Sequence, residues 1–151
     1  MSFRREIKAT LNKGKLSTLS KWIFDNRGKI LYPERLINSI YFDTRNLNMY
    51  TESMEGILPR KKIRLRTYFS SNSFDKLQDK SSLEYKISSV EGRFKISKKK
   101  FKKININSST GMRDKDYGFC QPILNVVYLR SYYIIKNVRL TIDKSITYKK
   151  V

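Results

Sequence analysis

The sequence predicts an α+β fold, mainly an antiparallel β-barrel with a few short helices, over one domain spanning residues 1–151. Most segments alternate apolar with charged residues, which is the period of two of a β-strand. The length suits a single domain with a modest core, and 39% of the residues are hydrophobic, enough to form that core. No internal repeat and no linker divides the chain.

The first segments predict a strand and then a helix. Residues 3–11 alternate, with Arg5 as the exception. Asn12 can then cap a helix that ends at residues 26–28. Apolar residues three or four positions apart form one face of this helix: Leu16, Leu19, Trp22 and Ile23.

The central segments predict two more strands around a short helical turn. Residues 36–42 form the first, and Asp43 or Thr44 caps the turn that follows. The alternation of residues 61–69 is the cleanest in the chain. It places Ile63, Leu65 and Phe69 on one face and Lys62, Arg64, Arg66 and Tyr68 on the other.

The remaining segments predict a hairpin and a second pair of strands. Residues 82–88 and 93–97 alternate around the turn at Glu91-Gly92. Further strands are expected at residues 123–135 and 137–143. The polar residues 70–81 and 104–121 are expected to be loops, and the basic run 98–103 to be helical or solvated.

The charge balance predicts an anionic partner. The formal net charge is +20, which suits nucleic acid, an anionic membrane surface or a phosphate-rich ligand. The chain has no histidine, which excludes His-based nucleophilic activation and His-ligated zinc. Cys120 is the only cysteine, so an intrachain disulfide framework is excluded.

The first residues have no secretory signal, and no run of apolar residues is long enough to cross a membrane. We therefore expect a cytoplasmic location, including the cytosolic face of a membrane complex.

The charged faces of the strands have two readings. An antiparallel sheet with one solvated face gives the same alternation. The repeat of Arg64 and Arg66, with Arg130 and Arg139 in otherwise apolar strands, instead favours binding of phosphate oxygens by planar guanidinium groups. Closing such strands would produce a polar interior lined by cations and a few carboxylates, which is a phosphate tunnel.

Several motifs resemble the VTC domain of polyphosphate polymerases, in the CYTH-like superfamily of triphosphate tunnel enzymes. The stretch RREIK is similar to the first-strand signature E-x-E-x-K, with Glu6 and Lys8 matching and Arg4 replacing the first Glu. Further segments follow in the family's order: 37–50, 59–68, 83–95, 122–133 and 138–143. The family domain continues past its equivalent of Asp143 into further strands with a metal-binding Glu, so we expect an incomplete barrel.

The resemblance implies binding of ATP and of polyphosphate or triphosphate, and transfer of the γ-phosphoryl group to a polyphosphate chain with Mn²⁺ or Mg²⁺. Phosphoryl transfer depends mainly on positioning and charge neutralisation, which cations supply. The residues implied to bind phosphate are Lys8, Arg64, Arg66, Lys86, Lys95, Arg130 and Arg139, of which Arg64, Arg66, Lys86 and Arg130 are the catalytic candidates. Glu6 is the candidate metal ligand and Glu84 a weaker one, since both ions prefer oxygen donors.

Three alternatives stay open. The domain could hydrolyse triphosphate, although Arg4 breaks the paired-Glu pattern of the hydrolytic relatives. It could bind polyphosphate or nucleotide without turnover. Nucleic-acid binding is disfavoured, because the alternation separates aromatics from cations.

A homodimer or a partner chain could complete an open barrel. An ion pair is as good a reading of Glu84 as a metal ligand, and a cap or ion pair is the expectation for Asp143.

Overall fold

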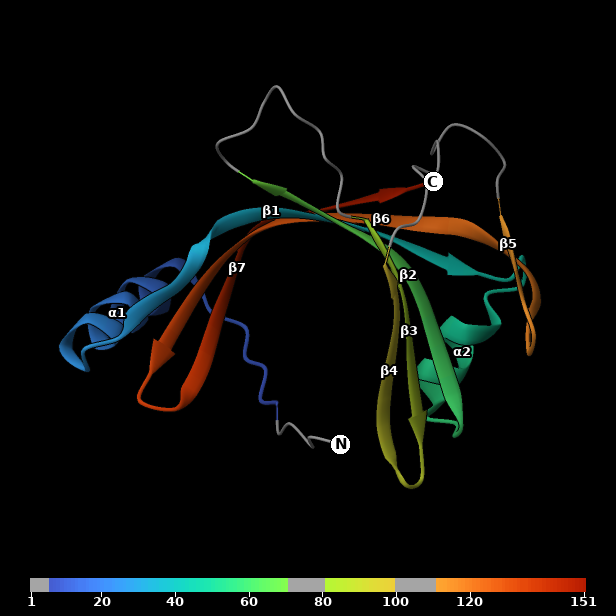
Figure 1. Ribbon diagram of the computed structural model, residues 1–151, viewed down its shortest axis with the longest axis horizontal. Helices are drawn as coiled ribbons and strands as arrows, with labels where there is room; N and C mark the ends of the chain where they lie inside the picture. Colours follow the sequence, from blue (N-terminus) through green and yellow to red (C-terminus); the bar gives the residue numbers. More distant parts are fainter. Residues whose placement is uncertain (1–5, 71–80, 100–110) are drawn as a thin grey trace. The chain divides into compact units, whose positions relative to one another are not determined.

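The structure is a computed structural model that describes residues 6–70, 81–99 and 111–151 (Figure 1). It contains helices and mostly antiparallel strands. The helices are α1 (Lys13–Asp25) and α2 (Asn48–Glu55). The strands are β1 (Lys29–Asp43), β2 (Arg60–Ser70), β3 (Ser82–Ser89), β4 (Gly92–Lys99), β5 (Met112–Asp114), β6 (Gly118–Ile135) and β7 (Val138–Lys150).

The strands form one sheet with the order β4-β3-β2-β1-β6-β5, and β7 pairs with β6 off this path. The α+β class with a mainly antiparallel sheet is therefore confirmed. The sheet is not closed, since no pairing among the described strands joins β4 to β5, so the predicted barrel is not shown.

The chain forms two compact units. The first contains residues 1–33 and 132–141, and the second contains residues 34–131 and 142–151. The interpretation of residues 1–151 as one tunnel domain stays a prediction.

Helix α1 lies in the first unit and begins as the sequence predicted. The Asn12 side chain accepts a hydrogen bond from the Lys15 amide at 2.8 Å, which caps the first turn. At the other end, the Gly28 amide donates to the Ile23 carbonyl at 2.8 Å. Gly28 is required there, because a Cβ would lie 2.6 Å from Ile23 Cγ2 and 3.0 Å from Ile135 Cγ1.

The strand predicted over residues 3–11 is wrong for its described part. Residues 6–12 have no regular secondary structure, and residues 6–10 are exposed. Alternation alone does not make a strand, because the apolar positions Ile7 and Leu11 have no buried face to occupy: they are 83% and 40% exposed.

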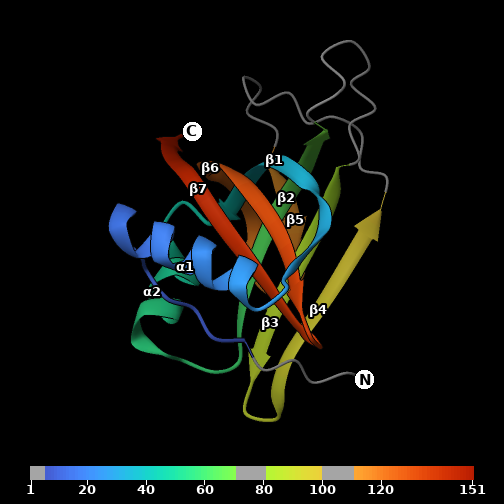
Figure 2. The same ribbon diagram turned by 90° about the vertical axis from the view of Figure 1, so that its left-hand side faces the viewer.

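The second unit carries the cleanest predicted strand, and its two faces separate as the sequence indicated. Ile63 and Leu65 of β2 are buried and pack in a core with Leu83 of β3. The other members of this core are Ile40, Phe42, Met49 and Cys120. The hairpin of β3 and β4 continues the sheet beside β2 in both ribbon views (Figure 1) (Figure 2).

The short helical turn predicted after β1 is helix α2, and Asp43 holds its first turn. The Asp43 carboxylate accepts hydrogen bonds from the amides of Met49 at 3.0 Å and Tyr50 at 2.9 Å. Asp43 is buried, so these amides satisfy a carboxylate that would otherwise be costly to bury. The cap that the sequence predicted is confirmed.

Several boundaries differ from the prediction. Strand β1 starts at Lys29, well before residue 36, and β7 continues to Lys150. Residues 112–121, expected to be a loop, contain β5, the turn at residues 115–117 and the start of β6. Lys98 and Lys99 of the basic run belong to β4, whereas residues 100–103 and the predicted loop residues 71–80 lie outside the described residues.

Among the described residues, neither helix is long and apolar enough to span a membrane.

Candidate functional site

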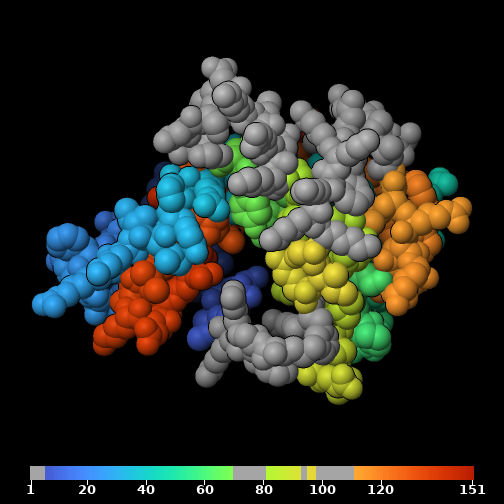
Figure 3. Space-filling view, in the orientation of Figure 1, coloured from blue at the N-terminus to red at the C-terminus, as the bar shows by residue number. Residues whose placement is uncertain are grey.

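Cationic residues gather on one face of β2, β3 and β4 because the strands pair in register. We call this set the cationic face, and it consists of Arg60, Lys62, Arg64 and Arg66 of β2, Lys86 of β3 and Lys95 of β4. Lys62 is opposite Lys86, and Lys86 is opposite Lys95. Lys86 and Lys95 are exposed, and β3 and β4 lie at the surface in the space-filling view (Figure 3).

Arg66 is the most deeply buried cation of this face, with 7% of its surface exposed. Its Nε donates to Ser39 Oγ at 3.2 Å and its Nη2 donates to the Tyr128 hydroxyl at 3.1 Å. The Tyr68 ring lies 5.9 Å from its Cζ. These hydrogen-bond partners are neutral, but the carboxylate of Glu84 lies close enough for the charge of Arg66 to help lower the pKa of Glu84.

Tyr128 connects Arg66 to a second arginine. Its hydroxyl accepts from Arg66, and the Arg130 guanidinium lies 5.1 Å from its ring centre. Burial raises the pKa of Tyr128 and keeps the phenol neutral. Arg130 makes two bonds to Asp143, at 2.5 and 2.6 Å, across β6 and β7. The expected ion pair of Asp143 is therefore confirmed.

Glu84 is the carboxylate at the centre of the cationic face and is 4% exposed. Oε2 accepts from Arg64 at 2.6 Å, and Oε1 lies 2.6 Å from Lys95 Nζ. Burial alone would raise the pKa of Glu84, but the bond to Lys95 and the charge of Arg64 outweigh it and lower the pKa. Glu84 is therefore ionised at neutral pH and pairs with two of the cations, Arg64 and Lys95, which together keep a net positive charge.

This arrangement does not fit a divalent ion. Both carboxylate oxygens of Glu84 are occupied by cations, and a metal would have to displace Arg64 or Lys95. Over residues 6–70, 81–99 and 111–151, no group of three or more Asp, Glu, His or Cys side chains could hold a metal. The prediction that Glu84 binds a metal thus has no geometric support, and the ion-pair reading describes what the structure contains.

The predicted site residues are divided between the two units. Arg64, Arg66, Lys86, Lys95 and Arg130 belong to the second unit, together with Glu84. The remaining residues, Glu6, Lys8 and Arg139, belong to the first unit and are exposed. Glu6 and Lys8 form a loose ion pair with each other at 3.8 Å.

A pocket of about 160 Å³ lies at the start of β2 on the cationic face. It is lined by Arg60, Lys62, Lys86 and Ser88. The lining contains three cations and a hydroxyl, and no carboxylate. Anionic groups of small size are the ligands such a lining favours.

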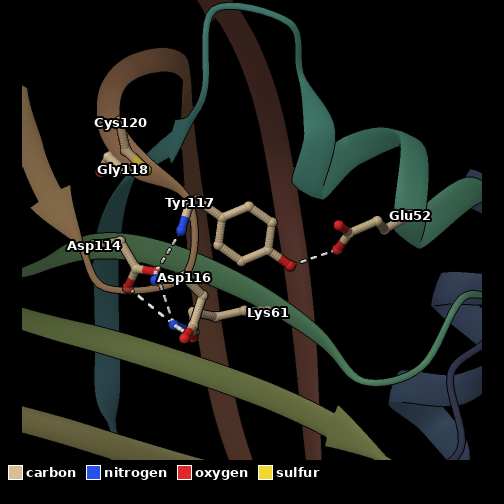
Figure 4. Close-up of polar contacts among 7 residues, drawn as sticks. All are labelled: Glu52, Lys61, Asp114, Asp116, Tyr117, Gly118 and Cys120. Carbon is tan, nitrogen blue, oxygen red and sulfur yellow. Dashed lines mark hydrogen bonds and ion pairs between the residues drawn. The ribbon is translucent and has the colours of Figure 1, made fainter.

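The opposite face of β2 holds one buried cation, Lys61, which the sequence analysis did not single out. Its Nζ bonds both oxygens of Asp114 at 2.9 and 3.0 Å and also contacts Asp116 (Figure 4). Burial lowers the pKa of Lys61, but the bonds to Asp116 and Asp114 outweigh it and raise the pKa. Tyr117, beside them, donates from its hydroxyl to Glu52 of α2 at 2.5 Å. These hydrogen bonds connect the β5–β6 hairpin to β2 and to α2. Lys61 belongs to the face of β2 opposite the cationic face, so this network lies outside that face.

Sequence reasoning missed Ser39 and Tyr128 as partners of Arg66. Tyr128 is buried, but its hydroxyl has a polar role. Its spacing of two from Arg130 was the available signal, since alternate residues of a strand share a face. Ser39 gave no signal, because a small hydroxyl in an apolar strand is common.

Comparison with curated proteins finds no match to this chain. A family comparison finds the VTC domain, which matches residues 3–151. The match extends over the motifs named above and over both units, and it agrees with a CYTH-like placement. The chain therefore belongs to the VTC domain family, whose function is related to polyphosphate.

Proposed function

We propose that the cationic face binds the triphosphate of ATP and linear polyphosphate, and that the domain transfers the γ-phosphoryl group of ATP to the polyphosphate chain. Membership of the VTC domain family supports the polyphosphate part. The chemistry of the face supports the binding part, since Arg64, Arg66 and their neighbours supply hydrogen bonds and positive charge in fixed positions.

Arg66 carries this proposal. Burying a guanidinium is costly unless a negative charge compensates it, and the hydrogen-bond partners of Arg66 are neutral. Glu84 is the carboxylate that acts on Arg66, but it also pairs with Arg64 and Lys95. A phosphate group beside Arg66 adds the negative charge that this one carboxylate cannot supply to three cations. Arg64 is held differently, because Glu84 already neutralises it in the free protein.

A second candidate is a module that binds phosphate chains without turnover. The ion pairs of Glu84 with Arg64 and Lys95 favour it, because they occupy the buried carboxylate that a metal would need. Mn²⁺ or Mg²⁺ as a cofactor therefore stays a prediction, and no step of our proposal passes through it.

The binding proposal is tested by Arg66→Ala. The substitution removes charge-assisted hydrogen bonds and should weaken tripolyphosphate binding by about 1.5–3 kcal/mol, measured by isothermal titration calorimetry. Arg113→Ala is the matched control, since Arg113 is exposed on β5 and absent from the cationic face. Equal affinities of the two variants would contradict the proposal.

Turnover needs a separate assay. Purified protein is incubated with ATP and Mn²⁺, and the products are separated on a gel that resolves polyphosphate. A polyphosphate ladder that disappears in Arg66→Ala supports transfer. Retained tripolyphosphate binding without any product supports the non-catalytic module.

Nucleic-acid binding is tested in the same preparation by competition between tripolyphosphate and a short RNA. We expect tripolyphosphate to win at equal phosphate concentration. If RNA wins and Arg66→Ala binds RNA normally, the high net charge rather than the cationic face determines the partner.

A further inference from the structure

Exposed apolar side chains gather at one end of the first unit, where α1 is followed by β1 and where β6 turns into β7. Phe24 is 83% exposed, Ile30 76%, Val138 68% and Trp22 48%. We call these four residues the apolar tip. We propose that the apolar tip is a membrane-docking surface, whose side chains insert into a bilayer that contains anionic lipids.

A packed contact brings the two turns of the apolar tip together. Gly28 lies against both Ile23 of α1 and Ile135 of β6, since a Cβ on this glycine would be 2.6 Å from Ile23 Cγ2 and 3.0 Å from Ile135 Cγ1. The turn before β1 and the turn between β6 and β7 also lie next to each other in Figure 1 and in Figure 2. The exposed apolar residues therefore flank one small buried contact, although they come from distant parts of the sequence.

The helical geometry of α1 keeps two aromatic side chains outside this contact. Successive residues of a helix are about 100° apart, so the buried Ile23 leaves Trp22 on one side and Phe24 on the other. The sequence predicts Trp22 on the packed face of α1, yet about half of its surface is exposed. Aromatic side chains with exposed apolar surface are enriched at the interface between a membrane and water.

The charges around the apolar tip are almost all positive. The exposed cations of residues 21–30 and 136–139 are Lys21, Arg27, Lys29, Lys136 and Arg139. Asp25 is the only acidic residue in these two segments. Apolar side chains flanked by Lys and Arg favour an anionic membrane surface, because apolar burial and attraction to the lipid headgroups act together.

The same charges disfavour a second copy of the chain as the occupant. Two copies joined at the apolar tip would bring the two sets of cations together, and the net charge of +20 on each chain opposes this association. An anionic bilayer instead neutralises the cations and offers acyl chains to the apolar side chains. The inference is independent of the proposed function, since every residue of the cationic face belongs to the second unit.

Trp22 is the only tryptophan of the chain, so its fluorescence reports on the apolar tip alone. The wild-type protein is mixed with vesicles of phosphatidylcholine, with and without phosphatidylserine, and with phosphatidylserine vesicles whose phosphatidylcholine carries brominated acyl chains. We expect the protein to sediment with the phosphatidylserine vesicles, the Trp22 emission to shift to shorter wavelength, and the brominated chains to quench it. Sedimentation without this shift and quenching would mean that the net charge binds headgroups through another face, and it would overturn the proposal. Failure to sediment with phosphatidylserine vesicles would overturn it as well.

Substitutions that keep every charge test the apolar contribution. Phe24→Ser with Ile30→Ser should weaken the affinity for phosphatidylserine vesicles by about tenfold or more, as expected from the loss of two large apolar side chains that insert. The control is Met54→Ser with Val90→Ser, which replaces side chains of 70% and 89% exposure in the second unit and should bind as the wild type does. Circular dichroism checks that both variants are folded. Equal affinities of the two double variants would contradict insertion of the apolar tip.

A second copy as the occupant would give a different result. In that case the Trp22 emission would shift with rising protein concentration in the absence of vesicles, and this outcome would overturn the membrane proposal. We expect the emission without vesicles to stay constant with protein concentration.

Discussion

The Arg66 side chain of β2 reaches past the neighbouring strand β1 to donate a hydrogen bond to the Tyr128 hydroxyl of β6 at 3.1 Å. Ser39 lies on the intervening strand β1 and is fully buried, and its hydroxyl oxygen accepts a hydrogen bond from Arg66 Nε. A guanidinium held from two strands has a fixed direction, which lowers the entropy cost of binding a phosphate group.

Tyr128→Phe should weaken both folding and binding, because it removes one acceptor of a buried guanidinium while leaving the ring in place. We expect the free energy of unfolding to fall by about 1–3 kcal/mol in urea denaturation, with a loss of tripolyphosphate affinity in calorimetry. Tyr148→Phe is the control, since Tyr148 is 69% exposed. Wild-type values for Tyr128→Phe would contradict a positioning role for this hydroxyl.

Lys61→Met should destabilise the protein strongly. It leaves the buried carboxylate of Asp114 without its cation, which costs about 3–5 kcal/mol, measured by urea denaturation. Lys62→Met changes the same residue type at the next position, where the side chain is exposed, and should shift stability by no more than about 0.5 kcal/mol. Similar losses of unfolding free energy in Lys61→Met and Lys62→Met would show that the ion pairs of Lys61 contribute little to stability.

Stability should fall on acidification, and Asp114 should contribute to the fall. Burial raises the pKa of Asp114, but the bond to Lys61 outweighs it and the net pKa is lowered. A lowered folded-state pKa stabilises the protein above the unfolded-state pKa, and this contribution is lost as the pH falls through the folded-state value.

Melting temperatures between about pH 3 and pH 7 test this effect, because this range covers the ordinary carboxylate pKa. Asp114→Asn should melt lower than the wild type near neutral pH, and its melting temperature should fall less on acidification. If the melting temperatures of the two proteins fell equally with pH, the pH dependence would not come from Asp114.

Glu84→Gln should strengthen tripolyphosphate binding in metal-free buffer, because it releases Arg64 and Lys95 from a neutralising carboxylate. An increase of several-fold is expected from the added charge. Glu55→Gln, at an exposed position of α2, removes the same charge elsewhere and serves as the control. Weaker binding that appears only with Mn²⁺ present would instead identify Glu84 as a metal ligand.

The faces of β2 could be predicted from the sequence because the two sets of residues differ strongly in chemistry. Ile63 and Leu65 can be buried only on the face opposite Arg64 and Arg66. A shift of the strand by one residue would expose the two apolar side chains and bury the two arginines. The pairing of β2 with β3 follows the same division, since Leu65 lies opposite Leu83 and Arg64 lies opposite Glu84.

The failures have physical causes of their own. Residues 6–11 also alternate, but alternation is not sufficient where the apolar side chains stay exposed. The β5–β6 hairpin was missed because β5 has only three residues, too few for a period to be seen. Lys61 was overlooked because its partners Asp114 and Asp116 lie 53 and 55 residues away.

The register of β2 is set by its apolar residues rather than by its ion pair. In the segment KKIRLR, a slip by one residue would exchange Lys61 for Arg60 or Lys62 at the buried position facing Asp114, so Asp114 would still face a cation. The same slip would place Arg64 or Arg66 among Ile40, Phe42 and Leu83, where a guanidinium is costly to bury. The apolar core behind β2 therefore fixes which face the row of arginines occupies.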